Sequence, residues 1–493
     1  KIEANASYTD GKSSSPDFKR LQYYEDRSSH SFQIGGTIGD GVHRYYRYLS
    51  DELFDSRLSF EFPLGNKPGI ERKLKFGGSY QRSDLKNDLY DYSVLNGVNL
   101  TALTNQDINA FFILDKFDIH TGTDVNGLTY SAIDWYYSEA NYPANHIFGN
   151  SAIESAYMMT DYSITSSLRF SGGLRIEWAD LFTDVYKFDS LNLARNDPRR
   201  SDPPGSDLIN PGKLNQTSYL PSASLIYKLR NDENAPLNLR FNYSQSVARP
   251  SLRELSGVSY VDYELNERVY GNPDLKPVSI KNYDIRAENY FKSGENISLS
   301  FFYKDFKDHI ELVHSNGYTW RNVGKSYVKG VEIEGKKMLT KNFSLGANVT
   351  FVNSVTNLVR TRDESSNGIS TIIPLDTIKR AMYGQAPYAI NGILTYTADS
   401  IGLIVTASYN IQGPRLVITS SIAERPDVYE LKRNLLDVKI SKTLGKHFSV
   451  SLSAKDIIND AVRRSYNNPD GYSLDYDRFT YGRTYILGIS YKL

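Results

Sequence analysis

The amino-acid sequence predicts an all-β protein, and within that class a large antiparallel transmembrane β-barrel. Three observations support this prediction: long segments in which apolar and polar residues alternate, an abundance of tyrosine, and short turns that alternate with long polar loops. The chain has 493 residues, of which 38 are Tyr and 22 are Phe, while its mean hydropathy is −0.46. Residues that favour strands are therefore abundant in a chain that is polar overall.

The composition excludes several functional classes. The 57 basic residues balance the 57 acidic ones, which argues against nucleic acid as a partner because such a partner needs a basic face. The chain has no cysteine, so it has no disulfide, no thiolate metal site and no cysteine nucleophile. No window approaches the roughly 20 consecutive apolar residues of a transmembrane helix. A soluble chain of this length would normally form roughly two or three domains, whereas a barrel accommodates residues 1–493 as one domain.

Period-two alternation is clearest in five segments. In the last of these, the apolar positions are Tyr485, Leu487, Ile489, Tyr491 and Leu493. The same pattern holds in residues 237–243, 297–303, 343–351 and 448–454. Successive side chains in a strand point to opposite faces, so each segment has one apolar and one polar face. Alternation alone also fits a soluble β-sandwich with its polar face in solvent.

The spacing of the turns favours the barrel over the sandwich. Short turns recur at Thr165–Ser167, Asn231–Ala235, Ser293–Glu295, Thr340–Asn342, Ala398–Gly402 and Leu444–Lys446. Between them lie long polar segments at Leu191–Asn215, Ser251–Pro277, Thr356–Leu375 and Gln412–Asp427. Short turns at one end and long loops at the other are typical of outer-membrane barrels, with the loops outside the cell. We expect about 16 to 18 strands, and residues 104–145 are the hardest to interpret.

Two neighbouring motifs resemble the barrel of TonB-dependent outer-membrane receptors. The first is YSQSVARPSLREL at residues 243–255, and the second is YGNPDLKP at 270–277, which is followed by NYDIRAE at 282–288. Shorter matches are GGLRIE at 172–177, NVG at 322–324, GVEIE at 330–334 and SAKDIIND at 453–460. These pieces occur in the family's order over roughly residues 166–493. The combination is specific, although each piece alone is weak.

The motif residues have a structural interpretation. Gly271 and Asn272 accept unusual backbone angles, and Pro273 and Pro277 fix theirs, so together they make a rigid re-entry into the next strand. We therefore interpret the whole set as structural and assign no substrate-binding residue. The set consists of Arg249, Pro250, Gly271, Asn272, Pro273, Leu275, Pro277, Gly330 and Glu332.

The resemblance implies a function in transport. Such a barrel would import a large, scarce solute, such as an iron chelate, a cofactor or an oligosaccharide, across the outer membrane of a Gram-negative cell. Its partners would be the lipid bilayer, a plug domain inside the barrel and the TonB complex. A surface lipoprotein lid, as in the SusC-type glycan importers, is a less favoured partner because that branch usually has a different strand at residues 244–255. The alternative is a structural or accessory outer-membrane barrel, or an outer-membrane enzyme, without transport.

No catalytic or metal centre emerges from the motifs, and no cofactor is expected. Gly324-Lys325-Ser326 resembles the end of a phosphate-binding loop, but Thr319 stands where the first glycine belongs. The chain has no G-x-S-x-G elbow and no H-E-x-x-H motif among its seven histidines, so we expect no enzymatic activity.

Three weaker candidates for ligand sites are His309 with His314, an acidic loop, and the tryptophans. The two histidines lie five positions apart on an expected loop. The acidic loop has an incomplete calcium spacing and contains Asp470, Gly471, Asp475 and Asp477. Trp135, Trp178 and Trp320 either stack on aromatic or sugar ligands or belong to the aromatic belts at the membrane surfaces, and we favour the belts.

The strand count bears on the completeness of the barrel. The family's barrels have 22 strands around a plug, and no part of this sequence resembles the plug or the TonB-contacting segment. We therefore expect Lys1–Asp10 not to be the first strand of the barrel. The chain would form the C-terminal three quarters or so of the barrel. The first strands and the plug would lie upstream in the same gene product or in a separate piece of it.

The topology predicts which positions face the cell exterior. Because the chain has no cysteine, single cysteines introduced at Arg200 and Glu364 can be labelled selectively. We expect both to react with a membrane-impermeant maleimide in intact cells, and a cysteine at Glu295, in a short turn, to stay unlabelled. Labelling at Glu295 but not at the other two positions would invert the topology.

Overall fold

The structure is a computed structural model of the chain. It describes residues 1–493 except 22, 27–30, 35–41, 66–71, 97–102, 105–118, 124, 134, 140–144, 186–210, 233–234, 258, 263–266, 292–293, 316, 367–368, 421–425, 467–473 and 493. The described part is almost entirely β-structure, and 24 of its strands belong to one sheet. The all-β prediction is thus confirmed. None of the helices in this part is long and apolar enough to cross a bilayer.

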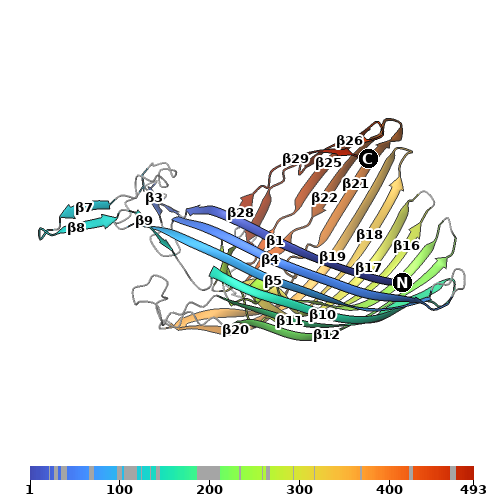
Figure 1. Cartoon of the computed structure of the whole chain (residues 1–493), viewed down its shortest axis with the longest axis horizontal. Helices are drawn as coiled ribbons and strands as arrows, with labels where there is room; N and C mark the ends of the chain where they lie inside the picture. The colour runs from blue at the N-terminus through green and yellow to red at the C-terminus, as the bar shows by residue number, and fades with distance from the viewer. Residues whose placement is uncertain are drawn as a thin grey trace.

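Sixteen long strands, each antiparallel to the next, form a curved wall (Figure 1). This number agrees with the lower end of the predicted range. The strands of the wall, in order of pairing, are β1 (Ile2–Leu21), β4 (Val42–Pro63), β5 (Arg72–Asn96), β10 (His146–Ser163), β11 (Leu168–Val185), β12 (Gly212–Arg230), β13 (Leu237–Ala248), β16 (Val278–Tyr290), β17 (Asn296–Ser315), β18 (Gly317–Met338), β19 (Phe343–Ser366), β21 (Tyr388–Ala398), β22 (Leu403–Gln412), β25 (Arg433–Leu444), β26 (Phe448–Lys455) and β29 (Thr484–Tyr491).

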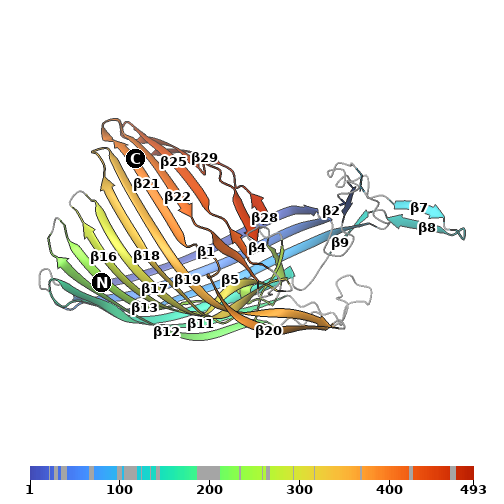
Figure 2. The ribbon, with the colours of Figure 1, turned by 180° about the vertical axis from the view of Figure 1, so that it is seen from behind.

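Shorter elements lie mainly at one end of this wall (Figures 1 and 2). The strands are β2 (Tyr23–Asp26), β3 (Ser31–Ile34), β6 (Leu103–Thr104), β7 (Ile119–Thr123), β8 (Thr129–Ile133), β9 (Trp135–Glu139), β14 (Ser259–Asp262), β15 (Glu267–Tyr270), β20 (Ile369–Arg380), β23 (Arg415–Ser420), β24 (Val428–Glu430), β27 (Val462–Tyr466) and β28 (Leu474–Phe479). The helices are α1 (Leu252–Leu255) and, at the opposite end, the 3₁₀ turn η4 (Asp399–Ile401).

The two ends of the wall differ as the turn spacing predicts. All six short turns join consecutive wall strands at the end where both termini lie (Figure 1). Three of these turns contain Gly294, Gly402 or Gly445, with φ of 75°, 63° and 66°, a conformation that glycine adopts without strain. Three of the predicted long loops are wrong in detail. Thr356–Leu375 is mostly strand and extends β19 and β20 as a long hairpin. Ser251–Pro277 contains α1, β14 and β15, and Gln412–Asp427 contains β23.

The outer face of the wall has an apolar band bordered by aromatic rings. The border on the side of the long loops includes a row of neighbouring tyrosines, which we call the tyrosine row. It consists of Tyr243, Tyr283, Tyr303 and Tyr327, whose successive ring centroids lie 5.2, 6.1 and 6.0 Å apart. Between this row and the short turns, exposed apolar side chains fill the outward positions of successive strands, for example Ile285 and Phe301. The border on the side of the short turns has further ring pairs, such as Phe343 with Tyr396. A band of exposed apolar residues between aromatic girdles is the surface that a barrel presents to lipid.

The opposite face of the wall is polar, and its groups are paired with one another. Arg240 and Arg286 both bind Glu288, and Arg286 also binds Glu334, at N–O distances of 2.6, 3.2 and 3.0 Å. A ladder of amides, Asn348, Asn391 and Asn410, continues along three further strands. Pairing matters here because a half-buried charge without a partner is strongly destabilising. We assign this face to the lumen.

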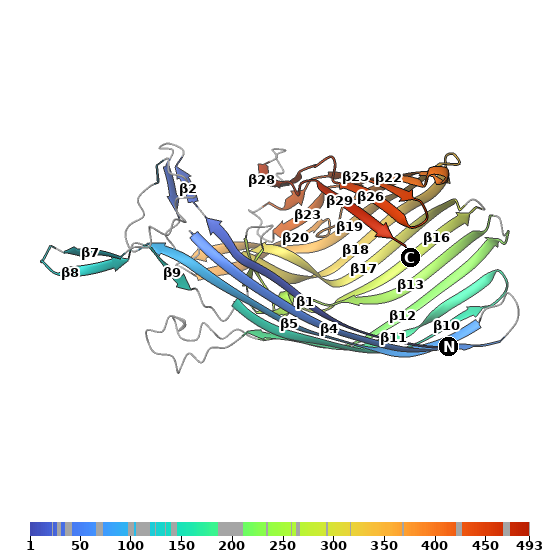
Figure 3. The same ribbon diagram turned by 45° about the horizontal axis from the view of Figure 1, so that its top comes forward.

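The wall is open along one side (Figure 3). Among the described residues no pairing joins β29 to β1, so the sheet has two free edges. Strand β1 runs away from the short-turn end, and strand β29 runs toward it. An antiparallel sheet that closes the gap therefore needs either direct pairing of β1 with β29 or an even number of additional strands.

A charge placed in the apolar band should destabilise the wall. Phe301 is 50% exposed on the outer face, so we expect Phe301→Arg to lower the free energy of unfolding by roughly 2–4 kcal/mol in lipid vesicles. The matched control is Thr350→Arg. Val331 of β18 aligns Phe301 with Phe351 of β19, and Thr350 is the residue before Phe351, so its side chain points to the luminal face. This substitution should be far less destabilising. Urea unfolding followed by tryptophan fluorescence measures both. Equal losses would contradict the assignment of the two faces.

Candidate functional site

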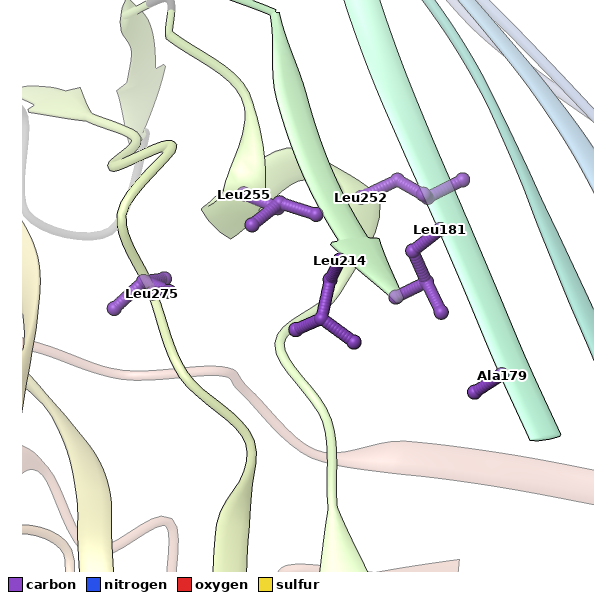
Figure 4. Packing of buried hydrophobic residues seen from close by; sticks show 6 residues of the cluster. All are labelled: Ala179, Leu181, Leu214, Leu252, Leu255 and Leu275. Atoms are coloured by element: carbon purple, nitrogen blue, oxygen red, sulfur yellow. The ribbon is translucent and has the colours of Figure 1, made fainter. Parts of the chain in front are cut away.

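The first family motif forms a short helix that packs on the luminal face. Ser251 caps α1, and the Ser251 hydroxyl accepts from the Glu254 N–H while the Glu254 carboxylate accepts from the Ser251 N–H. Leu252 and Leu255 then join a buried cluster, which Figure 4 shows beside β11 and β12. Its members are Ala179, Leu181, Leu214, Leu252, Leu255 and Leu275. Sequence reasoning did not predict this helix, although its S-x-x-E spacing is a capping signature.

Arg249 and Pro250 lead into this helix. The Arg249 guanidinium binds Glu177 on β11 at 2.9 Å, and both side chains are largely buried. Glu177 is also held by Arg175, at 2.7 Å. This pairing draws the end of β13 toward β11, across β12, and so places α1 over the luminal face.

The second motif closes over α1. At Gly271 an added Cβ would lie 2.1 Å from the Ser256 carbonyl oxygen, so only glycine fits this approach. The Asn272 N–H donates to the Glu254 carbonyl, and the Asn272 amide donates to the Trp320 carbonyl, at 2.7 and 2.9 Å. The loop therefore ties α1 to β18.

The remaining motif residues also lie on or beside the wall. Pro273 occupies the turn after Asn272, Leu275 is buried in the α1 cluster, and Pro277 immediately precedes β16. Gly330 in β18 leaves room for the Phe302 ring, which an added Cβ would meet at 2.4 Å. Glu332 is half-buried on the luminal face. The structure thus brings Arg249, Gly271, Asn272 and Leu275 together around α1, and it places Gly330 and Glu332 separately, in the wall.

At the long-loop end several hairpin tips pair with one another in a branch of the same 24-stranded sheet, and we call this branch the tip sheet. Its pairing order is β14–β15–β18–β17–β23–β24–β27–β28, and its β15–β18 and β17–β23 pairs are parallel. The tip of the β17–β18 hairpin leaves the wall where Asp308 adopts φ 59°. Its Ile310 and Trp320 pack against the α1 cluster on β11 and β12. The tip sheet therefore reaches across the luminal face. Alternation within single strands does not reveal it, because these pairings join distant parts of the sequence.

A buried ionic cluster anchors the tip sheet to the wall. Glu311, fully buried in β17, binds Arg380 at 2.5 Å and His309 at 2.8 Å, and it accepts from the Tyr383 N–H. The other ring nitrogen of His309 lies 2.9 Å from the Ser326 hydroxyl. Burial alone would raise the pKa of Glu311, but the hydrogen bond from His309 and the charge of Arg380 together lower it below its usual range. The ionic cluster lies on the long-loop side of the tyrosine row, outside the apolar band that faces lipid.

A cavity of about 350 Å³ lies between the tip sheet and the wall. The tip sheet contributes Trp320 and Arg464, the wall contributes Asn410 and Gln412, and Tyr383 lies at the corner between them. Charged, amide and aromatic side chains thus converge on one space at the expected extracellular end. A concave site with a few convergent polar groups is the usual form of a small-molecule site.

The weaker candidates from the sequence separate in the structure. The expected loop is wrong for both histidines, because His309 and His314 lie in strand β17. His309 belongs to the ionic cluster, whereas the His314 ring lies 4.6 Å from the Tyr318 ring between centroids, with the planes tilted by 51°. Trp178 is 44% exposed on the outer face, and Trp320 lines the cavity. Gly324-Lys325-Ser326 lies within β18, with no helix after it. Across the described ranges no group of three or more acidic or histidine side chains is arranged to hold a metal ion.

Two further candidates fall partly or wholly on residues whose side chains are not described. Asp470 and Gly471 of the acidic loop lie outside the described residues, and Asp477 in β28 pairs with Arg464 at 3.1 Å. The side chain of Trp135 in β9 also lies outside them, as does most of the predicted loop at Leu191–Asn215.

Solved structures with the same fold include two receptors and a copper transporter. The siderophore receptor PiuA from Acinetobacter baumannii superposes with a TM-score of 0.57 at 14% identity, covering 99% of this chain and 62% of PiuA. The ferripyoverdine receptor of the Pseudomonas aeruginosa outer membrane gives 0.54 at 15% identity, covering 94% of this chain and 50% of that one. The copper transporter OprC gives 0.54 at 13% identity, covering 99% and 62%. The chain thus spans less than two thirds of each protein. No curated protein is significantly similar to it in sequence.

An antiparallel wall with an apolar outer band, a polar lumen and folded loops over one end defines a membrane-spanning receptor barrel. Residues 3–457 match the family described as TonB dependent receptor-like, beta-barrel. The chain belongs to this family, whose members are outer-membrane receptors, as the motifs at residues 243–288 predict.

The close approach at Gly271 should make that position intolerant of any side chain. Gly271→Ala forces a methyl group against the Ser256 carbonyl and should lower stability by about 1–3 kcal/mol. Gly346→Ala in β19 is the matched control, since an added Cβ there meets nothing within 4 Å. Thermal unfolding in detergent compares the two. If both variants melt alike, the packing of α1 under Gly271 is wrong.

The Glu311 cluster should make the tip sheet sensitive to acid. Because the pKa of Glu311 is lowered on folding, the stability it contributes is present at pH above its unfolded value of 4.5 and is lost as the pH falls through the folded value. Glu311→Gln leaves Arg380 buried without its anionic partner and should cost about 3–5 kcal/mol at neutral pH. It should also abolish the acid-dependent part of the loss.

The control for Glu311→Gln is Asp376→Asn, which breaks the solvent-exposed Arg360–Asp376 pair and should change little. Limited proteolysis of the tip sheet as a function of pH measures both variants. An acid profile of Glu311→Gln identical to that of the unmodified chain would contradict the role of this carboxylate.

Proposed function

We propose that this chain is the barrel part of a TonB-dependent importer that carries a large, scarce solute, such as an iron chelate, a cofactor or an oligosaccharide, across the outer membrane of a Gram-negative cell. The observation that carries the proposal is the cavity between the tip sheet and the wall. It lies at the long-loop end of a polar lumen, where a solute arriving from outside would first be held. Family membership supports the same proposal.

We further propose that the chain, as one domain, forms the C-terminal three quarters or so of a 22-stranded barrel. The free edges of β1 and β29 support this, since each unpaired backbone group in lipid costs several kcal/mol. The additional strands would be even in number and would come, with a plug, from another part of the same protein. The plug would occupy the lumen against the paired polar groups, and the TonB complex would act on the plug.

The proposed mechanism breaks no bond in the solute. The chain would bind the solute at the outer end of the lumen, and energy from TonB would move the plug to open a path. We propose no enzymatic activity and no resident cofactor. We propose that the nine motif residues act structurally: Arg249, Gly271, Asn272 and Leu275 by holding α1, Pro250, Pro273 and Pro277 by fixing the backbone around it, and Gly330 and Glu332 within the wall.

The alternative is an outer-membrane barrel with a structural or accessory role, with or without a surface lipoprotein. Uptake measurements in intact cells separate the two. Cells that carry the complete receptor should gain an energy-dependent uptake of one solute class, and loss of TonB should abolish that uptake. Surface binding that persists without energy and leads to no accumulation would instead favour the accessory role.

A further inference from the structure

The chemistry of the cavity narrows the class of solute. Three guanidinium groups line it, and each is already neutralised by a carboxylate: Arg415 by Glu430, Arg433 by Asp456 and Arg464 by Asp477, at 3.0, 2.9 and 3.1 Å. The ionic groups at the cavity therefore sum to no net charge. An anionic ligand would have to displace carboxylates from these pairs, so the cavity does not favour a strongly anionic solute.

The polar groups that remain are hydrogen-bonding groups of both kinds. Within the described part of the chain the Gln412 amide makes no side-chain hydrogen bond, so it offers one acceptor and two donors. The Arg433 guanidinium also lines the cavity and lies 5.0 Å over the Tyr481 ring. A ligand hydroxyl group both donates and accepts, so it matches the free groups of the Gln412 amide.

Aromatic surfaces complete the cavity. Trp320 and Tyr383 meet edge to face, with ring centroids 6.4 Å apart and planes at 87°, and Tyr481 also lines the cavity. Large, rigid aromatic rings beside donors and acceptors suit a ligand with apolar C–H faces and hydroxyl edges. A volume of about 350 Å³ is near the lower end for small-molecule sites, so the cavity fits the end of a longer molecule.

We infer that the cavity between the tip sheet and the wall binds the terminal units of an uncharged oligosaccharide, with a sugar face on Trp320 and a hydroxyl group on the Gln412 amide. This inference rests on the proposed function and selects one of its solute classes. Hydroxyl groups both donate and accept, so they match a site in which cations and anions are already paired. Among the described residues that line the cavity, each cation is paired with a carboxylate, so an iron chelate of high negative charge would find no free cation there.

The test uses the complete receptor purified in detergent and a panel of short neutral oligomers of glucose, mannose, galactose, xylose and fructose. Ferric catecholate and ferric hydroxamate chelates serve as comparison probes. We expect at least one neutral oligosaccharide to bind and to quench tryptophan fluorescence. The affinity should be nearly unchanged between low and high salt, because screening acts only on charge–charge attraction.

Variants locate the binding site. Trp320→Ala should weaken binding roughly tenfold, the usual effect of losing an aromatic contact. Trp178→Ala, which removes the same residue type from the outer face, should leave binding unchanged. Because Trp320 also packs against the α1 cluster, Gln412→Ala is a second variant that loses no internal hydrogen bond and should weaken binding several-fold without unfolding the chain.

Three binding results would overturn the inference: binding of no oligosaccharide in the panel, binding unaffected by both cavity variants, or salt-sensitive binding of a ferric chelate that depends on Arg433. Energy-dependent uptake of such a chelate would overturn the inference and leave the proposed function intact. Absence of any TonB-dependent uptake would overturn the proposed function, whatever the purified receptor binds.

Discussion

The pairing of backbone hydrogen bonds in lipid is the constraint on which this structure depends. A strand that crosses a bilayer has no water to satisfy its N–H and C=O groups, so each wall strand must be paired on both sides. From β1 to β29 each inner strand of the wall pairs with a neighbouring strand on both sides. The same constraint makes the two free edges the most informative feature of the wall, because it requires partners for them.

Beyond the lipid band the constraint relaxes, and the hairpins change partners. The β17–β18 hairpin pairs with β16 and β19 inside the band and with β15 and β23 outside it. Outside the band, water can satisfy backbone groups that are left unpaired where the strands change partners. The buried Glu311–Arg380 pair stabilises the new pairing. The cavity exists only because of this switch, since its lining comes from both the tip sheet and the wall. Function is therefore expected where the pairing rule of the membrane no longer applies.

The candidate site was only partly predictable. The motif around Gly271 was identified from the sequence as a rigid turn, and in the structure that glycine lies where no side chain fits. Trp320 was considered as a stacking residue but assigned to the membrane belts, whereas it lines the cavity. Arg433 and Gln412 carry no motif at all. They become neighbours of Trp320 only through pairings between different strands, among them the parallel pairing of Val313 with Thr419, and spacing within one strand contains no information on such pairings.

The sequence by itself determined the fold class, the two faces of each strand and the alternation of short turns with long loops, because side-chain period and turn chemistry are local properties. It also determined the family, through motifs that shape a turn and a short helix. Only the tertiary structure decided how the long hairpins extend beyond the membrane, how their tips pair to form the tip sheet and which charges neutralise one another. Those outcomes depend on contacts between residues far apart in the chain, and local patterns do not encode which distant groups meet.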